Sequence, residues 1–119
     1  MLYAILCYNS EAALSQWTPE EDEAVMTRHA QVMKGLAAQG KTGPTARLMP
    51  TASARTVRGS DKTIVDGPFA ETKEQLLGFY IVDCASLEEA TSIAQQLAEP
   101  PGCTEVRPVH TYWPAVLGS

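Results

Sequence analysis

The chain has 119 residues, the length of one domain with a modest buried core. Apolar residues make up 45% of it and charged residues 19%, as in ordinary globular proteins. The formal net charge is −5, from 9 Lys and Arg against 14 Asp and Glu. Nucleic-acid-binding proteins need an excess of cations to replace the counterions of phosphates, so we expect no direct nucleic-acid contact.

The three cysteines, Cys7, Cys84 and Cys103, are odd in number and widely spaced, which favours neither a zinc site nor a disulfide framework. We therefore expect a reduced, cytoplasmic protein. The first apolar run, MLYAILCYN, is too short for a signal peptide and follows no basic residue. No stretch is long enough to span a membrane, so we expect no membrane contact. From the length, residues 1–119 are expected to form one domain.

Strands are predicted in four places. Residues 1–8 and 76–84 are apolar on both alternating faces, which is typical of strands covered on both sides in the middle of a sheet. Residues 45–49 can form another strand. The last strand is predicted over residues 104–112, at a sheet edge because Pro108 lacks a backbone N–H.

Two helices are predicted from their starting signals. Thr18 and Glu21 form a capping box, and this helix should run to about residue 39 with Gly40 as its stop. Ser86 begins a second capping box. His29 falls on the apolar stripe of the first helix. The buried faces should consist of Val25, Val32 and Leu36 in the first helix, and Ala90, Ile93, Ala94 and Leu97 in the second.

The remaining segments are predicted as connections. Residues 9–16 join the first strand to the first helix. Residues 54–58 and 62–65 flank a Gly-Ser-Asp turn and predict a hairpin. Asp66-Gly67-Pro68 predicts a turn in which the Asp66 side chain bonds backbone amides, and residues 70–75 one helical turn.

This order of elements predicts an α+β domain on the ferredoxin-like βαββαβ plan, with an inserted hairpin. That plan places the first and third main strands in the middle of the sheet, and these are the two strands that are apolar on both faces. Two helices cover only one face of such a sheet. Because a bare apolar face is unusual on a monomer, we expect a homodimer packed sheet to sheet.

Residues 66–76 read DGPFAETKEQL and are followed by Gly78-Phe79-Tyr80. This segment resembles the signature of the DGPF group within the YCII-related (YciI-like) family, with further matches at Arg47-Leu48 and in the EVRP of residues 105–108. The resemblance implies a dimeric α+β barrel of ferredoxin-like subunits. YciI-like relatives include an enzyme that eliminates chloride from a chlorinated hydroxyhydroquinone, and DGPF proteins are often associated with alternative sigma factors.

The resemblance also implies a catalytic His on the first helix, with an Asp-Pro after the second helix as its partner. His29 lies at the matching helical position, and the second site reads Glu99-Pro100, an acid one methylene longer. Two interpretations of His29 stay open. It can be a hydrogen-bonded residue that fills the space beneath the sheet, or a general base oriented by Glu99 or Asp66. For Asp66 the turn gives a purely structural alternative.

Five residues are candidates for substrate binding. Arg47 can grip a carboxylate with its planar fork. Glu71 and Lys73 form either a pocket rim or a solvated charged turn. Tyr80 and Phe69 complete the set, and Phe69 is also expected to fill the core.

No Ser/His/Asp set, phosphate-binding loop or metal-ligand spacing is present in the sequence, so we expect no metal and no cofactor. The residues then favour a cofactor-free acid/base enzyme of lyase or isomerase type, with a small carboxylated or phenolic substrate. The alternative is a non-catalytic ligand-binding or regulatory module associated with a sigma factor, favoured by the basic hairpin of residues 55–62. A third alternative is a dimeric domain whose pocket is vestigial.

Overall fold

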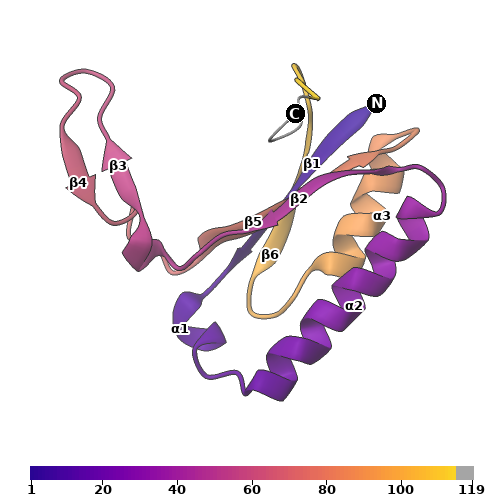
Figure 1. Cartoon of the computed structure of the whole chain (residues 1–119), viewed down its shortest axis with the longest axis horizontal. Helices are drawn as coiled ribbons and strands as arrows, with labels where there is room; N and C mark the ends of the chain where they lie inside the picture. The colour runs from indigo at the N-terminus through magenta and orange to yellow at the C-terminus, as the bar shows by residue number, and fades with distance from the viewer. Residues whose placement is uncertain (115–119) are drawn as a thin grey trace.

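The structure is a computed structural model that describes residues 1–114 and has a mixed α+β architecture (Figure 1). A four-stranded sheet has the order β2-β5-β1-β6, and every neighbouring pair is antiparallel. The prediction that the first and third main strands are central is confirmed, and the order is compatible with the ferredoxin-like plan. The strands are β1 (Leu2–Asn9), β2 (Thr42–Arg47), β5 (Gln75–Asp83) and β6 (Cys103–Pro108).

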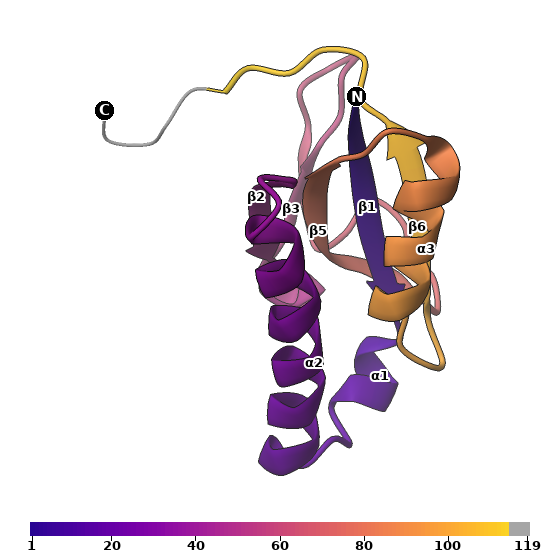
Figure 2. The same ribbon diagram turned by 90° about the vertical axis from the view of Figure 1, so that its right-hand side faces the viewer.

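Three α-helices are present in the described residues: α1 (Glu11–Leu14), α2 (Pro19–Ala37) and α3 (Leu87–Leu97). Figures 1 and 2 show α2 and α3 lying side by side on one face of the sheet. The capping box that begins α2 is confirmed, because Thr18 and Glu21 exchange backbone-to-side-chain hydrogen bonds. None of the helices in residues 1–114 combines the length and hydropathy needed to cross a membrane.

The core lies between these two helices and the sheet. Ile5 and Val82 are completely buried from the sheet side, and Leu97 is 1% exposed from the helix side. Burying one such side chain stabilises the fold by about 1.5–3 kcal/mol, so this layer holds the helices in place. The predicted buried set of α3 is confirmed in full: Ala90, Ile93, Ala94 and Leu97.

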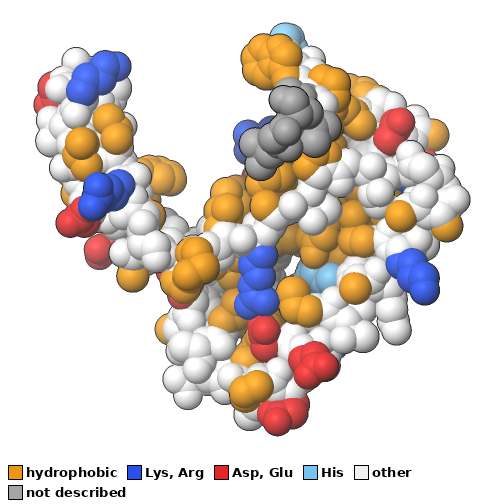
Figure 3. Space-filling model, in the orientation of Figure 1, with side chains coloured by type: hydrophobic (Ala, Val, Ile, Leu, Met, Phe, Trp, Pro, Cys, Tyr) orange, Lys and Arg blue, Asp and Glu red, His pale blue; other side chains and the backbone are white. Residues whose placement is uncertain are grey.

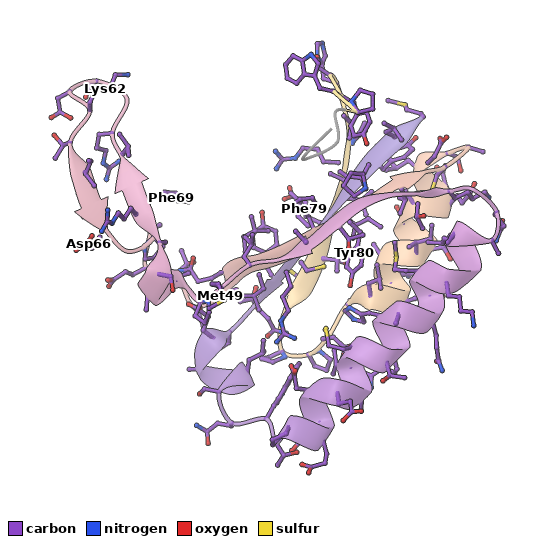
Figure 4. All side chains as sticks on the ribbon, viewed as in Figure 1. Met49, Lys62, Asp66, Phe69, Phe79 and Tyr80 are labelled. Atoms are coloured by element: carbon purple, nitrogen blue, oxygen red, sulfur yellow. The ribbon has the colours of Figure 1, made fainter. Side chains whose placement is uncertain are left out.

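The other face of the sheet carries apolar side chains that no element of the described chain covers. Because side chains alternate along a strand, the neighbours of Ile5 and Val82 point away from the helices. Figure 4 shows this alternation on β5, with Phe79 and Tyr80 on opposite sides of the sheet. We call this surface the open face; its apolar residues, all partly buried, are Leu2, Ala4, Leu6, Phe79 and Ile81.

Between β2 and β5 the chain leaves the body as an arm, residues 48–74 (Figure 1). The predicted hairpin is confirmed within it: β3 (Arg55–Val57) pairs antiparallel with β4 (Ile64–Asp66) in a separate two-stranded sheet. A 3₁₀ turn, η1 (Thr51–Ser53), precedes the hairpin.

Several boundaries differ from the sequence-based prediction. Residues 9–16 contain α1, because the Ser10 hydroxyl accepts from the Ala13 amide and caps a short helix. The predicted strand over residues 45–49 begins earlier, at Thr42, and ends at Arg47. The last strand ends at Pro108 rather than at residue 112, and the Val109 amide makes one more bond, to the Leu2 carbonyl.

The prediction of a helical turn over residues 70–75 is wrong. The Thr72 hydroxyl donates to the Glu74 carbonyl, and the side-chain amide of Gln75 donates to the carbonyls of Ala70 and Thr72. These side-chain bonds take the place of the backbone bonds of a helical turn. Phe69 does not fill the core, since it is 79% exposed on the arm. Among the described hydrogen bonds Asp66 makes none to a backbone amide; its partner is Arg55, at 3.6 Å.

Gly102 offers a test of how the loop before β6 packs against the end of β1. A Cβ at this position would lie 2.6 Å from Asn9 Cγ and 2.8 Å from Asn9 Cα, closer than real contacts allow. We expect Gly102→Ala to lower the free energy of unfolding by about 3 kcal/mol, measured by urea denaturation. Gly35→Ala is the control, because nothing lies within 4 Å of its Cβ; it should stabilise by about 0.5–1 kcal/mol. Equal stability of the two variants would contradict this packing.

Candidate functional site

A cavity of about 230 Å³ lies on the helix side of the sheet, where the ends of α2, α3, β1 and β5 meet. Its walls are largely apolar, with Leu14 and Trp17 from the segment before α2 and Leu77 from β5. Polar side chains that line it come from five separate parts of the chain, among them Asn9, His29, Arg47, Tyr80 and Glu99. A small apolar cavity with a few polar groups is the usual form of a ligand site.

His29 is buried, at 7% exposure, and both of its ring nitrogens have partners. Its Nδ1 lies 2.9 Å from the Tyr80 hydroxyl, and its Nε2 lies 3.2 Å from Glu99 Oε1. An ionised carboxylate only accepts hydrogen bonds, so Nε2 carries the proton. In the neutral ring Nδ1 then accepts from the Tyr80 O–H, and the order of donation runs from Tyr80 to His29 to Glu99.

Glu99 is held in place from both its side chain and its backbone. Arg28 Nη2 lies 2.7 Å from each carboxylate oxygen, and the Asn9 side-chain amide donates to the Glu99 carbonyl at 3.0 Å. Arg28 and His29 are consecutive on α2, so one turn of helix directs a guanidinium and an imidazole at the same carboxylate. This arrangement fixes the acceptor on which the orientation of His29 depends.

Burial changes the acidity of two groups in the cavity. Burial raises the pKa of the Tyr80 hydroxyl, as does the Cys7 thiol to a smaller extent, while Arg47 lowers it. Burial, with Cys103 as the second cause, raises the pKa of Cys7 to about 11. At neutral pH Tyr80 is therefore a phenol that can donate a proton. Cys7 is a thiol and a poor nucleophile.

Arg47 ends β2 beside the cavity, half exposed, and pairs with Asp22 of α2. Its Nη2 lies 2.9 Å from Asp22 Oδ1, and both side chains are solvent-accessible. Such exposed pairs contribute about 0–1 kcal/mol, so an incoming anion can replace Asp22 at little cost. Arg47 is the cation best placed to meet an anion at this cavity.

The structure brings together four of the predicted site residues and leaves four apart. His29, Arg47, Tyr80 and Glu99 line the cavity. Asp66, Phe69, Glu71 and Lys73 lie in the arm and are not among the residues that line it. Within this chain Glu99, and not Asp66, orients His29. The functional roles of the four arm residues stay predictions.

Sequence reasoning did not single out Arg28, Asn9, Trp17 or Cys103 as site residues. The position of Arg28 next to His29 could have drawn attention to it, but no nearby residue in the sequence indicates its contact with Glu99. Cys103 lies 3.8 Å from Glu74 through its sulfur, at the side of the cavity nearest the end of the arm. Within residues 1–114 no three His, Cys, Asp or Glu side chains are grouped closely enough to hold a metal ion.

These features define the class of protein: a small α+β domain whose sheet and helices enclose a buried histidine between a phenol and a carboxylate. The family model of the YCII-related domain matches residues 1–112, and the chain belongs to this family. A protein of Rhizobium meliloti (strain 1021), described as uncharacterised, is 53% identical to it over 124 residues, which covers 100% of both chains.

The hydrogen bonds of His29 predict its tautomer. We expect neutral His29 to carry its proton on Nε2, because the Glu99 carboxylate can only accept there. Nitrogen NMR of the imidazole ring measures this directly. His110 is the control, because it is exposed and its Nδ1 partner is the Thr111 hydroxyl, which can donate or accept and so does not fix the tautomer as a carboxylate does. A proton on Nδ1 of His29 would contradict the proposed direction of the hydrogen bonds.

Proposed function

We propose that this protein is an acid/base enzyme of lyase or isomerase type that acts on a small carboxylated or phenolic compound without a cofactor. The observation that carries the proposal is His29, buried beside an apolar cavity with Tyr80 on one nitrogen and Glu99 on the other. Both nitrogens of a buried imidazole need partners, and a donor on one side with an acceptor on the other is also the arrangement that a proton-transfer group uses.

The geometry supports a relay of protons through the ring. When Tyr80 gives its proton to His29 Nδ1, the ring becomes an imidazolium, which the Glu99 carboxylate stabilises from the other side. The Tyr80 oxygen then takes a proton from a carbon next to a substrate carbonyl. In an elimination the leaving group departs from the neighbouring carbon with its bonding electrons, and the imidazolium loses its extra proton to solvent. In an isomerisation Tyr80 returns the proton to a different carbon and takes back the proton held by His29.

The cavity sets the class of substrate. About 230 Å³ suits a molecule no larger than a single substituted ring, below the usual size of a drug site. Trp17 and Leu14 offer apolar walls to a ring, and Arg47 offers a fork for a carboxylate at the rim. A negative charge on the substrate would then lie away from Glu99.

The regulatory alternative rests on the arm. Arg58 and Lys62 are exposed around the β3–β4 turn, where they could meet an acidic surface of a sigma factor. Such a module would bind a ligand in the cavity without turning it over. Binding together with turnover that depends on His29 favours the enzyme.

The open face supports a homodimer as part of this proposal. Two copies packed sheet to sheet would cover the apolar side chains that a single chain leaves in contact with water. A two-fold axis would make the same surface serve both partners, and two such sheets would form the α+β barrel expected from the family resemblance.

His29→Ala tests the chemistry. We expect turnover of the active member of a panel of small phenolic acids and hydroxylated keto acids to fall at least about 100-fold, because the proton acceptor is lost. Steady-state kinetics measures the loss, and His110→Ala is the control with a histidine outside the cavity. Turnover that is unchanged in His29→Ala would remove His29 from the mechanism.

Arg47→Ala tests the anion site with 4-hydroxybenzoate, which carries a carboxylate and a phenol, as the probe. We expect the Kd from isothermal titration calorimetry to rise about tenfold, because one charge-assisted hydrogen bond contributes that much to the binding affinity. Lys34→Ala is the control, because Lys34 is an exposed cation of α2 that does not line the cavity. The same loss in both variants would indicate a general charge effect and contradict a specific role for Arg47.

A further inference from the structure

The arm exposes large apolar side chains far beyond the scatter normal on a protein surface. Phe69 is 79% exposed and Met49 is 76% exposed. The other large apolar residues of the arm are also open to solvent: Ile64 at 64%, Val57 at 58%, Val65 at 49% and Leu48 at 44%. Single exposed apolar residues need no explanation, but six on one short projection do.

Within residues 1–114 the arm is bonded to the body near its two ends, where Thr51 bonds Glu11 and Glu74 bonds Cys103, while the β3–β4 hairpin has no bond to the body. Strands β3 and β4 pair only with each other, in a sheet separate from the main one. An isolated two-stranded sheet is marginally stable in water, so the arm needs a surface to pack against. Apart from its base, the arm stands clear of the body in Figures 1 and 3.

The arm and the open face form the two walls of one concave surface. Figure 3 shows the hollow between the arm and the body, with hydrophobic side chains on both sides of it. In Figure 4 Phe69 lies on the side of the arm toward the body, and Asp66 lies on the opposite side. At the turn between them Gly67 has a φ of +95°, a conformation that suits glycine and redirects the chain before Phe69.

The exposed area is large enough to matter in an interface. With about 150 Å² for a fully exposed large side chain, the six arm residues together expose roughly 550 Å². That is at the upper end of the largest apolar patch on a typical monomer, about 300–600 Å². A stable interface buries about 800 Å² on each partner, which the arm and the open face together can supply.

The arm as a whole has four cations and four anions, but its tip is basic, and this favours a copy of this chain as the partner. Residues 55–62 carry three cations, Arg55, Arg58 and Lys62, against the single anion Asp61, whereas the whole chain has a net charge of −5. The tip of the arm is therefore attracted to the acidic remainder of a second copy.

We infer that the arm is a dimer clasp: in a two-fold dimer packed sheet to sheet, the arm of each chain packs Phe69 and its apolar neighbours against the partner, beside the two apposed open faces. The inference rests on the homodimer of the proposed function and adds the part of the chain that holds it together. It also gives the DGPF segment a role, which is to turn the chain and present Phe69 to the partner.

Sedimentation equilibrium of the full chain tests the clasp. The double variant Ile64→Ser/Phe69→Ser removes two exposed apolar side chains without touching the core or the cavity. We expect its dimer dissociation constant to rise at least tenfold. The matched control is Leu87→Ser, since Leu87 is 46% exposed on α3, on the side of the sheet away from the open face. Its dissociation constant should stay that of the unaltered protein.

Hydrogen exchange gives a second measurement that does not depend on a variant. The amides of β3 and β4 should be protected in the dimer and lose that protection when the protein is diluted to monomer. Exchange that is independent of concentration would overturn the clasp.

The outcomes separate the two proposals. An unaltered protein that is monomeric at micromolar concentration overturns both the dimer and the clasp, while binding of 4-hydroxybenzoate still reports on the cavity. A dimer that the double variant and Leu87→Ser leave equally intact overturns the clasp alone. That result would leave the arm to another partner, such as the acidic surface of a sigma factor.

Discussion

A buried imidazole has two nitrogens to satisfy, and the cavity end of this fold depends on how His29 satisfies both. Tyr80 from β5 meets one nitrogen and Glu99 from the end of α3 meets the other. Glu99 is nearly buried, and a buried carboxylate needs a cation, which Arg28 supplies. The Asn9 side chain also donates to the Glu99 backbone carbonyl. One chain of hydrogen bonds thus links the first strand, both long helices and the third main strand. The same chain of bonds prepares a proton path.

The two faces of the sheet differ in what they contact and in the role that we propose for each. The helix side holds the core and the cavity, because α2 and α3 exclude water from it. The polar groups on that side, such as His29 and Glu99, are hydrogen-bonded to each other. The other side lacks a cover within residues 1–114, and the arm projects beside it with apolar residues of its own. The proposed chemistry and the proposed assembly therefore use opposite sides of one sheet. A change in the arm should alter association without reaching His29.

Local signals carried much of the fold. Capping residues predicted the start of α2, runs that are apolar on both faces predicted β1 and β5, and the apolar stripe of α2 predicted that His29 faces the sheet. Prediction failed where local side-chain bonds decided the backbone, as for the Gln75 amide that bonds Ala70 and Thr72 in place of a helical turn. It also failed for Phe69, since an aromatic residue is expected inside unless a projecting hairpin carries it away from the core.

Spacing along the chain and a motif read directly from the residues were enough to predict the four main strands, the two long helices, their order and the family. The sequence also identified His29, Arg47, Tyr80 and Glu99 as candidates, partly through the family resemblance. Only the tertiary structure decided which of the two acids, Asp66 or Glu99, lies beside His29. His29 and Glu99 are 70 positions apart in the sequence, and the packing of α2 against α3 and the sheet brings them into contact. No local sequence pattern predicts a contact of this kind. The same packing left the DGPF segment on the arm, outside the cavity.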